Sequence, residues 1–116
     1  MSYVTNVIFS TLLDESEVND FIKILDELVK KNYPKQVNSF LHIPNNKVGG
    51  TKCLESDLFV AAFNYLDCDF FKLFIKSLSS KFPSLNYDDF QIMILKEHST
   101  KWQIFDFETI DNLENL

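Results

Sequence analysis

Hydrophobic residues follow two different periods along this chain. Residues 57–66 are apolar at nearly every position and rich in β-forming types, which is typical of a strand with neighbours on both sides. Asp67 follows as a candidate N-cap. Apolar residues then recur at helical spacing, at Phe70, Phe71, Phe74, Ile75 and Leu78. The pattern predicts a central strand that runs directly into an amphipathic helix ending near Phe82.

The N-terminal part of the chain predicts the same pair of elements. Residues 3–12 alternate as a strand, and the segment 14–16 follows as a capping region. The next apolar residues have helical spacing, at Val18, Phe21, Ile22, Leu25, Leu28 and Val29. Acidic residues crowd the start of this helix and two lysines close its end, and both placements favour the helix dipole. Pro34 disfavours helical geometry in the residue before it, so the helix is expected to end there.

The remaining segments predict three short strands. Residues 37–43 form the first, and the loop 44–52 after it holds both glycines of the chain. Residues 90–95 and 102–107 form the other two, joined by a turn at 97–100. The acidic tail 108–116 is either a short docking helix or a frayed end.

This order of elements predicts a two-layer α+β fold. The order β-α-β-β-α-β is that of the ferredoxin-like plait, here with an extra strand added as a C-terminal hairpin. In that plait the strand order is 4-1-3-2, neighbouring strands are antiparallel, and both helices cover one face of the sheet. The 116 residues are expected to form a single domain with its own core, without disulfide or metal.

Charge and composition narrow the class of protein. The net charge is −6, and all 11 basic residues are lysine. Because arginine supplies the bidentate contacts to phosphate and guanine, an acidic chain without it is a poor candidate for binding nucleic acid. The longest apolar run, 58–63, is too short to span a bilayer, and the first residues carry no basic leader, so we expect a cytoplasmic protein without a membrane partner. The cysteines Cys53 and Cys68 are expected to be reduced thiols.

The sequence offers little catalytic chemistry. Its two histidines, His42 and His98, fall on the second strand and in the last hairpin turn, and satisfied or solvated side chains are the expected reading of both. The pairs Asp88-Asp89 and Asp67-Asp69 are a weak signal for Mg²⁺. No phosphate-binding loop, dinucleotide fingerprint or zinc motif is found. We therefore expect a protein that is not an enzyme and needs no cofactor.

Acidic residues from three segments are expected to meet at one edge of the predicted sheet, where the first strand ends and the third and fourth begin. These residues are Asp14, Glu15, Glu55, Asp57, Asp88 and Asp89. The nearby loop adds Lys47 and Lys52 as adaptable contacts. Such a cluster would steer a basic protein partner by its long-range field. The commoner alternative is that these acids only cap element ends and are solvated.

The predicted fold also leaves one face of the sheet without a covering layer. Alternation places Leu58, Val60, Ala62 and Leu66 on one side of the third strand, and Phe59, Ala61, Phe63 and Tyr65 on the other. The first strand likewise separates Val4, Ile8 and Leu12 from Val7 and Phe9, and the fifth separates Trp102 and Ile104 from Phe105 and Phe107. Two helices cover only one face, and several Phe side chains on the other would stay in contact with water. The C-terminal tail, a second copy of the chain or another protein could cover them, and we expect this face to be buried against a partner or a second copy.

The C-terminal half resembles small bacterial immunity proteins, which protect a cell from its own secreted or contact-delivered toxins. The resemblance rests on residues 62–67 with Phe70-Phe71 behind them, and on the strand 90–97 closed by 102–107. It implies a small acidic inhibitor that covers the active site or substrate surface of a toxin, often a basic nuclease. The alternative is a small-molecule-binding or regulatory plait that dimerises through its open sheet face.

Overall fold

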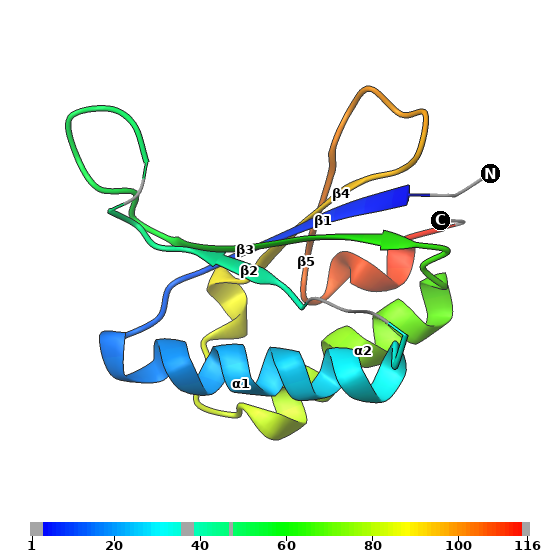
Figure 1. Ribbon diagram of the computed structural model, residues 1–116, viewed down its shortest axis with the longest axis horizontal. Helices are drawn as coiled ribbons and strands as arrows, with labels where there is room; N and C mark the ends of the chain where they lie inside the picture. The colour runs from blue at the N-terminus through cyan, green and yellow to red at the C-terminus, as the bar shows by residue number, and fades with distance from the viewer. Residues whose placement is uncertain (1–3, 36–38, 47, 115–116) are drawn as a thin grey trace.

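The computed structural model describes residues 4–35, 39–46 and 48–114, and Figure 1 shows their arrangement. The helices and strands are, in chain order, β1 (Val4–Thr11), α1 (Glu15–Asn32), β2 (Leu41–Ile43), β3 (Asp57–Asn64), α2 (Cys68–Lys81), β4 (Gln91–Leu95) and β5 (Gln103–Asp106). Two 3-10 helices, η1 (Tyr87–Asp89) and η2 (Thr109–Asn112), precede β4 and follow β5. No helix in these ranges is both long and apolar enough to cross a membrane.

The described strands form one antiparallel sheet in the order β2-β3-β1-β4-β5. This is the predicted plait order, with β5 added at the outer edge of β4. Figure 1 shows α1 and α2 side by side beneath the sheet and both long loops rising on its other side. The two-layer α+β prediction is therefore confirmed, and the added strand is the difference from the four-stranded plait.

Both helices begin where the capping residues predict. Asp67 precedes α2, and its carboxylate accepts hydrogen bonds from the backbone N–H groups of Asp69 and Phe70 at 2.9 and 3.1 Å. At α1 the backbone N–H of Asp14 donates to the Glu17 side chain at 3.0 Å, while the Glu17 N–H donates to the Asp14 carbonyl at 2.8 Å. These bonds satisfy backbone groups that would otherwise have no partner in the first turn.

Phenylalanine rings fill the space between the sheet and the helices. Along β1 every second side chain is buried, and Val7 and Phe9 are fully enclosed. Phe9 stacks on Phe40 with ring centroids 4.6 Å apart, and Phe21 of α1 meets Phe59 of β3 at 4.8 Å. Each such ring contributes about 1.5–3 kcal/mol by leaving water. The described part of the core therefore lies on the helix side of the sheet only. The expectation that strand Phe side chains stay in water on the uncovered face is wrong, because Phe9, Phe59 and Phe63 all pack under the helices.

The end of the central strand corrects the predicted alternation. β3 ends at Asn64 rather than at Leu66, because Tyr65 has a positive φ of 55° that turns the chain out of the strand. The turn reverses the two side chains that follow. Leu66, which the alternation grouped with Leu58 and Val60, is buried in the core, and Tyr65, grouped with Phe59 and Phe63, is 63 % exposed.

The second strand is much shorter than predicted. β2 contains only three residues, each paired with β3, whereas the expected strand was 37–43. Residues 36–38 lie outside the described part of the chain. Phe40 is buried against Phe9 and Phe63 just before the strand begins. An aromatic anchor therefore occupies a position that the alternating pattern assigned to the strand itself.

The C-terminal segment docks on the fold as a short helix. Ile110 and Leu113 of this segment are buried in the core. The Cys68 thiol donates to the Leu113 carbonyl at 3.2 Å, which confirms that Cys68 is a free thiol. Cys53 is free and exposed. Of the two alternatives for the tail, docking is correct through Leu113, while residues 115–116 lie outside the described part.

Candidate functional site

The predicted acidic edge exists, but its carboxylates do not form one cluster. The end of β1 lies beside the starts of β3 and β4, because Thr11 pairs with Asp57 and Ser10 pairs with Gln91. At this edge the acids divide between two separate hollows. Asp14 lies apart from both as the exposed residue before α1.

The first hollow lies at the starts of β3 and β4 and has a volume of about 400 Å³. Glu55, Asp88 and Asp89 line it, and all three are exposed. A hydrogen bond of 3.2 Å between the Ser10 and Ser56 hydroxyls lies in its wall. These three acids are the part of the predicted cluster that faces water together.

Asp57 is not on the exposed edge where the sequence placed it. It is 9 % exposed and lies on the helix side of β3, in alternation with Phe59. Its carboxylate is 3.0 Å from Nε2 of His42, and the side chains are 13 % and 18 % exposed. Because a carboxylate accepts hydrogen bonds, the ring nitrogen is the donor. His42 is thus a satisfied histidine, as expected, with a partner the sequence analysis did not identify.

A clue to this pair is present in the sequence. Asp57 stands at a position that shares its strand face with Phe59 and therefore points toward the core. A buried carboxylate is costly without a hydrogen-bond donor, so a donor had to be near. The register of β2 brings His42 opposite Phe59, which lies two residues from Asp57 on the same face of β3, and this register is not readable from the sequence.

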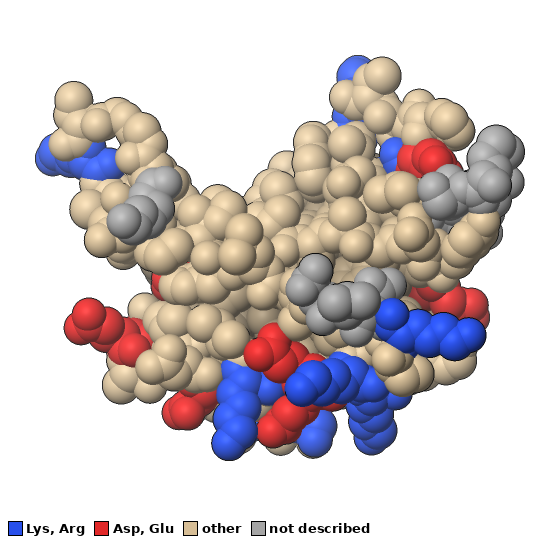
Figure 2. All heavy atoms as spheres, in the orientation of Figure 1, with Lys and Arg blue, Asp and Glu red and all other residues tan. Residues whose placement is uncertain are grey.

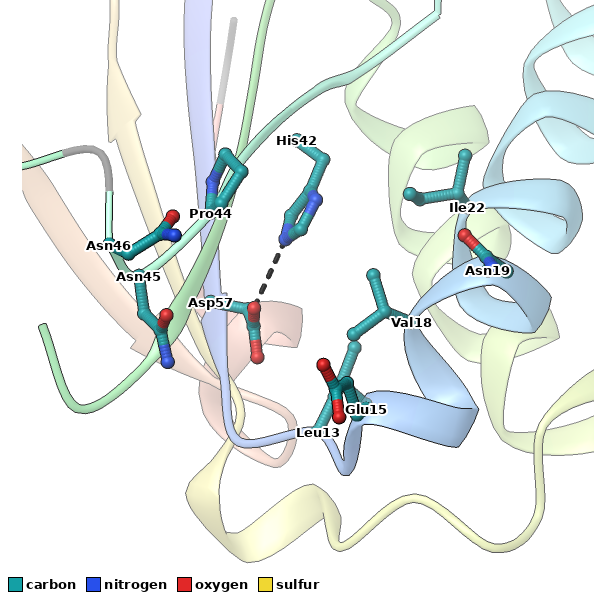
Figure 3. Close-up of a pocket in the computed structure, with 10 residues that line it drawn as sticks. All are labelled: Leu13, Glu15, Val18, Asn19, Ile22, His42, Pro44, Asn45, Asn46 and Asp57. Carbon is teal, nitrogen blue, oxygen red and sulfur yellow. Dashed lines mark hydrogen bonds and ion pairs between the residues drawn. The ribbon is translucent and has the colours of Figure 1, made fainter. Parts of the chain in front are cut away.

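The second hollow lies beside this pair, between the start of α1 and the segment that follows β2. Its volume is about 600 Å³. Figure 3 shows the side chains that line it: Leu13, Glu15, Val18, Asn19, Ile22, His42, Pro44, Asn45, Asn46 and Asp57. It contains two carboxylates, one imidazole and three amides against an apolar wall, so it is the most chemically varied of the hollows described.

The two lysines predicted as contacts belong to the long loop between β2 and β3. Lys52 is exposed in this loop, and Lys47 lies outside the described residues. The other histidine, His98, is exposed in the β4–β5 turn with a φ of 65°. Among the described residues, no group of three or more histidine, cysteine, aspartate or glutamate side chains could hold a metal ion.

The open face of the sheet carries a continuous apolar row. Strand pairing aligns one residue from each strand across the whole sheet, in the order Leu41, Val60, Ile8, Met93 and Ile104. The two ends of this row are 67 % and 65 % exposed at Leu41 and Ile104. Alternation in the sequence separated Val60, Ile8 and Ile104 from the phenylalanines of their own strands, and strand pairing places all three on the open face. The sequence analysis missed Leu41 and Met93, whose alignment depends on register.

Two loops rise beside this row and give the face a hollowed shape. Figure 1 shows the β2–β3 loop at one end and the β4–β5 turn at the other, both on the side away from the helices. Figure 2 shows the depressed surface between them, in which no charged side chain is visible except on the projecting loops, whereas many gather over the helices. Comparisons with protein-family models, with curated proteins and with solved structures found no match for this chain.

Proposed function

We propose that this protein is a non-catalytic inhibitor that binds another protein across its open sheet face. The observation that carries the proposal is the row from Leu41 to Ile104, which crosses all five strands of the described sheet. Scattered single apolar side chains are ordinary on a protein surface, but a contiguous apolar patch usually marks an interface. A partner that covers this row removes its exposed ends from water.

The shape of the face supports a protein partner. In the view of Figure 2 the hollow between the two loops shows no charged side chain, as is typical of the central part of an interface. The loops that bound it carry Lys52 on one side and Lys101 on the other. A partner element seated between them meets the apolar row, with Asn6 and Ser10 on either side of it on β1 and the lysines farther out, the usual plan of a specific protein contact.

The biological role we propose is that of an immunity protein that neutralises a bacterial toxin. Glu55, Asp88 and Asp89 then steer a basic toxin toward the end of the sheet at which β1 stops. The net charge of −6 supports this direction of attraction. The partner's active site or substrate surface is covered by the bound inhibitor, and no chemical step is required of the inhibitor itself.

A protection assay tests this proposal. The reading frames next to this gene are first searched for a secreted toxin domain, and cells that produce such a domain are expected to survive when they also produce the wild-type protein. Ile104→Lys places a charge at the end of the apolar row and is expected to abolish protection. Leu73→Lys is the matched control, because Leu73 is 62 % exposed but lies on α2, on the other side of the molecule. Equal protection by the two variants, or none by the wild type, contradicts the proposal.

A second candidate is a regulatory plait that binds a small molecule and dimerises through the same face. The observation that favours it is the hollow of about 600 Å³ at the edge between α1 and the sheet, a volume within the usual range of ligand sites. Sedimentation equilibrium of the isolated protein separates the two candidates. A stable dimer that Ile104→Lys dissociates favours this second function, and a monomer favours the inhibitor.

A further inference from the structure

The hollow beside His42 has an acidic side that is fixed in position by the fold. Asp57 is 9 % exposed and accepts the Nε2–H of His42 at 3.0 Å. The His42 ring stacks on Phe59 with centroids 4.8 Å apart and planes inclined by 23°, so the pair is held from below. A carboxylate offers about four acceptor positions, and this hydrogen bond uses one of them.

Other oxygen acceptors line the same space. Figure 3 shows Glu15, from the first turn of α1, on the same side of the hollow as Asp57, and Asn19 farther along the helix. The amides of Asn45 and Asn46 line the side formed by the segment after β2. Carboxylate and amide oxygens accept hydrogen bonds from a donor-rich ligand. Among the described lining residues none is a lysine, so within that set the acids face no competing primary amine.

The rest of the lining is apolar. Val18 and Ile22 project from one face of α1, and Pro44 lies across from them. This surface suits a short aliphatic chain and not a compact hydrated ion. The volume of about 600 Å³ also exceeds what a single ammonium group or metal ion needs.

The position at the start of α1 does not favour an anion. A helix N-terminus normally attracts negative charge, but here the first turn already carries the carboxylates of Glu15 and Glu17, and the Glu17 N–H is bonded to the Asp14 carbonyl. The two carboxylates of Glu15 and Asp57 would repel an anion placed beside them. The charge and the apolar wall together select a cation on an aliphatic chain.

We propose that this hollow is a binding pocket for an alkylguanidinium group. The planar guanidinium presents five N–H donors that pair with carboxylates in a bidentate manner, and its aliphatic stem packs against Val18 and Ile22. An arginine side chain of a polypeptide and a free alkylguanidine share this chemistry. The pocket lies on the helix side of the sheet and does not depend on the function proposed for the open face.

Titration of the ¹⁵N-labelled protein with three probes tests the proposal. Capped arginine (N-acetyl-arginine methylamide) and agmatine are expected to bind with dissociation constants of about 1 mM, a usual value for fragments of this size. Backbone amide shifts should be confined to residues 15–22, 41–46 and 57–59. Capped citrulline has the same shape without the charge and is expected not to bind. Binding of capped arginine identifies a polypeptide side chain as a source, and binding of agmatine alone identifies a free alkylguanidine.

Two variants and a matched control complete the test. Glu15→Gln is expected to weaken agmatine binding about threefold, because its carboxylate is exposed. Asp57→Asn is expected to weaken it by more than about tenfold, because its carboxylate is buried. Glu27→Gln, an exposed change of equal charge farther along α1, should have no effect. Equal binding of citrulline, shifts centred on Ile8 and Val60, or an equal loss in all variants would overturn the proposal, and Glu15→Gln decides it even if Asp57→Asn fails to fold.

Discussion

At the scale of single residues, two tyrosines in similar surroundings differ in one hydrogen bond. Both are half-buried, Tyr33 after α1 and Tyr87 in η1. The Tyr87 hydroxyl donates to the Phe82 carbonyl at 3.0 Å, whereas the buried Tyr33 hydroxyl has no partner among the described residues. Burial raises the pKa of each phenol to about 12, and the charge of Asp67 adds to the effect at Tyr33.

Removing the two hydroxyls should therefore have different consequences. Tyr87→Phe breaks a hydrogen bond and leaves the Phe82 carbonyl without that donor, so we expect a loss of about 1 kcal/mol in the free energy of unfolding. Tyr33→Phe removes a buried polar atom without a partner and should leave this free energy unchanged or slightly higher. Urea denaturation measures both. The same loss in the two variants would contradict the assignment of the hydrogen bond.

The raised pKa values also predict a loss of stability at high pH. In the unfolded chain both phenols ionise near 10, whereas in the folded protein they stay protonated to about 12. The folded state therefore holds more protons between these values, and its stability falls as pH rises from about 10 to about 12. The double variant Tyr33→Phe with Tyr87→Phe is the reference, because its lysines titrate as in the wild type while the two phenols are absent. The difference between the two stability curves therefore reports the tyrosines alone. Parallel stability curves for the wild type and the double variant across this range would contradict the prediction.

At the scale of elements, the hydrophobic period and the capping residues were sufficient to predict where both helices and the central strands lie in the sequence. α1 and α2 begin directly after Asp14 and Asp67, because a side-chain acceptor and an apolar stripe coincide there. The pattern was insufficient where tertiary contacts decide. β2 has three residues because the buried ring of Phe40 precedes it, and β3 stops early because Tyr65 adopts a positive φ.

The docked C-terminal segment makes a prediction at this scale. Ile110 is fully buried, so Ile110→Ala should lower the free energy of unfolding by about 3 kcal/mol through the lost burial and the cavity it leaves. Asn112→Ala, an exposed change in the same short helix, should alter it by less than about 0.5 kcal/mol. Thermal or urea unfolding compares the two. A small effect of both would show that η2 is not part of the cooperative core.

The start of η2 is fixed by local hydrogen bonds that composition alone does not reveal. The Asp106 carboxylate accepts the backbone N–H groups of Thr109 and Glu108 at 2.7 and 2.9 Å, and its own backbone N–H donates to the Thr109 hydroxyl at 2.9 Å. Hydrogen bonds that the carboxylate accepts, first from Thr109 and then from Glu108, lower the pKa of Asp106 from its usual value. The docked form of the tail follows from this turn together with the burial of Ile110 and Leu113.

At the scale of the whole molecule, charge and apolar surface are separated. Figure 2 shows charged side chains over the helices and a largely uncharged hollow above the sheet. The sequence predicted an open apolar face because two helices cover only one side of a plait. It could not predict how the acids divide, since Asp57 points inward beside His42 while Glu55, Asp88 and Asp89 stay exposed.

The exposed acids predict how a partner associates. If Glu55, Asp88 and Asp89 steer a basic toxin, its association rate should fall about tenfold between about 0.05 M and about 0.5 M NaCl. The triple variant Glu55→Gln, Asp88→Asn and Asp89→Asn should slow association at low salt by a similar factor and leave dissociation nearly unchanged. Stopped-flow or surface-based kinetics measure both rates.

A control with the same change in net charge separates local steering from the overall charge of the protein. The exposed residues Asp20, Glu27 and Asp69 lie on the two helices and outside the first hollow, so their conversion to amides should slow association less than the triple variant does. Equal rates for the two triple variants would contradict a role for the acids of the first hollow.

The central claim is that the open sheet face, and not the helical face, contacts the partner. Methyl cross-saturation in a complex with a toxin domain that the protein is found to bind distinguishes the two faces. Irradiating the toxin is expected to attenuate the methyl signals of Ile8, Val60, Met93 and Ile104 and to spare Leu73 on α2. Attenuation of Leu73 with the four sheet methyls unaffected would contradict it.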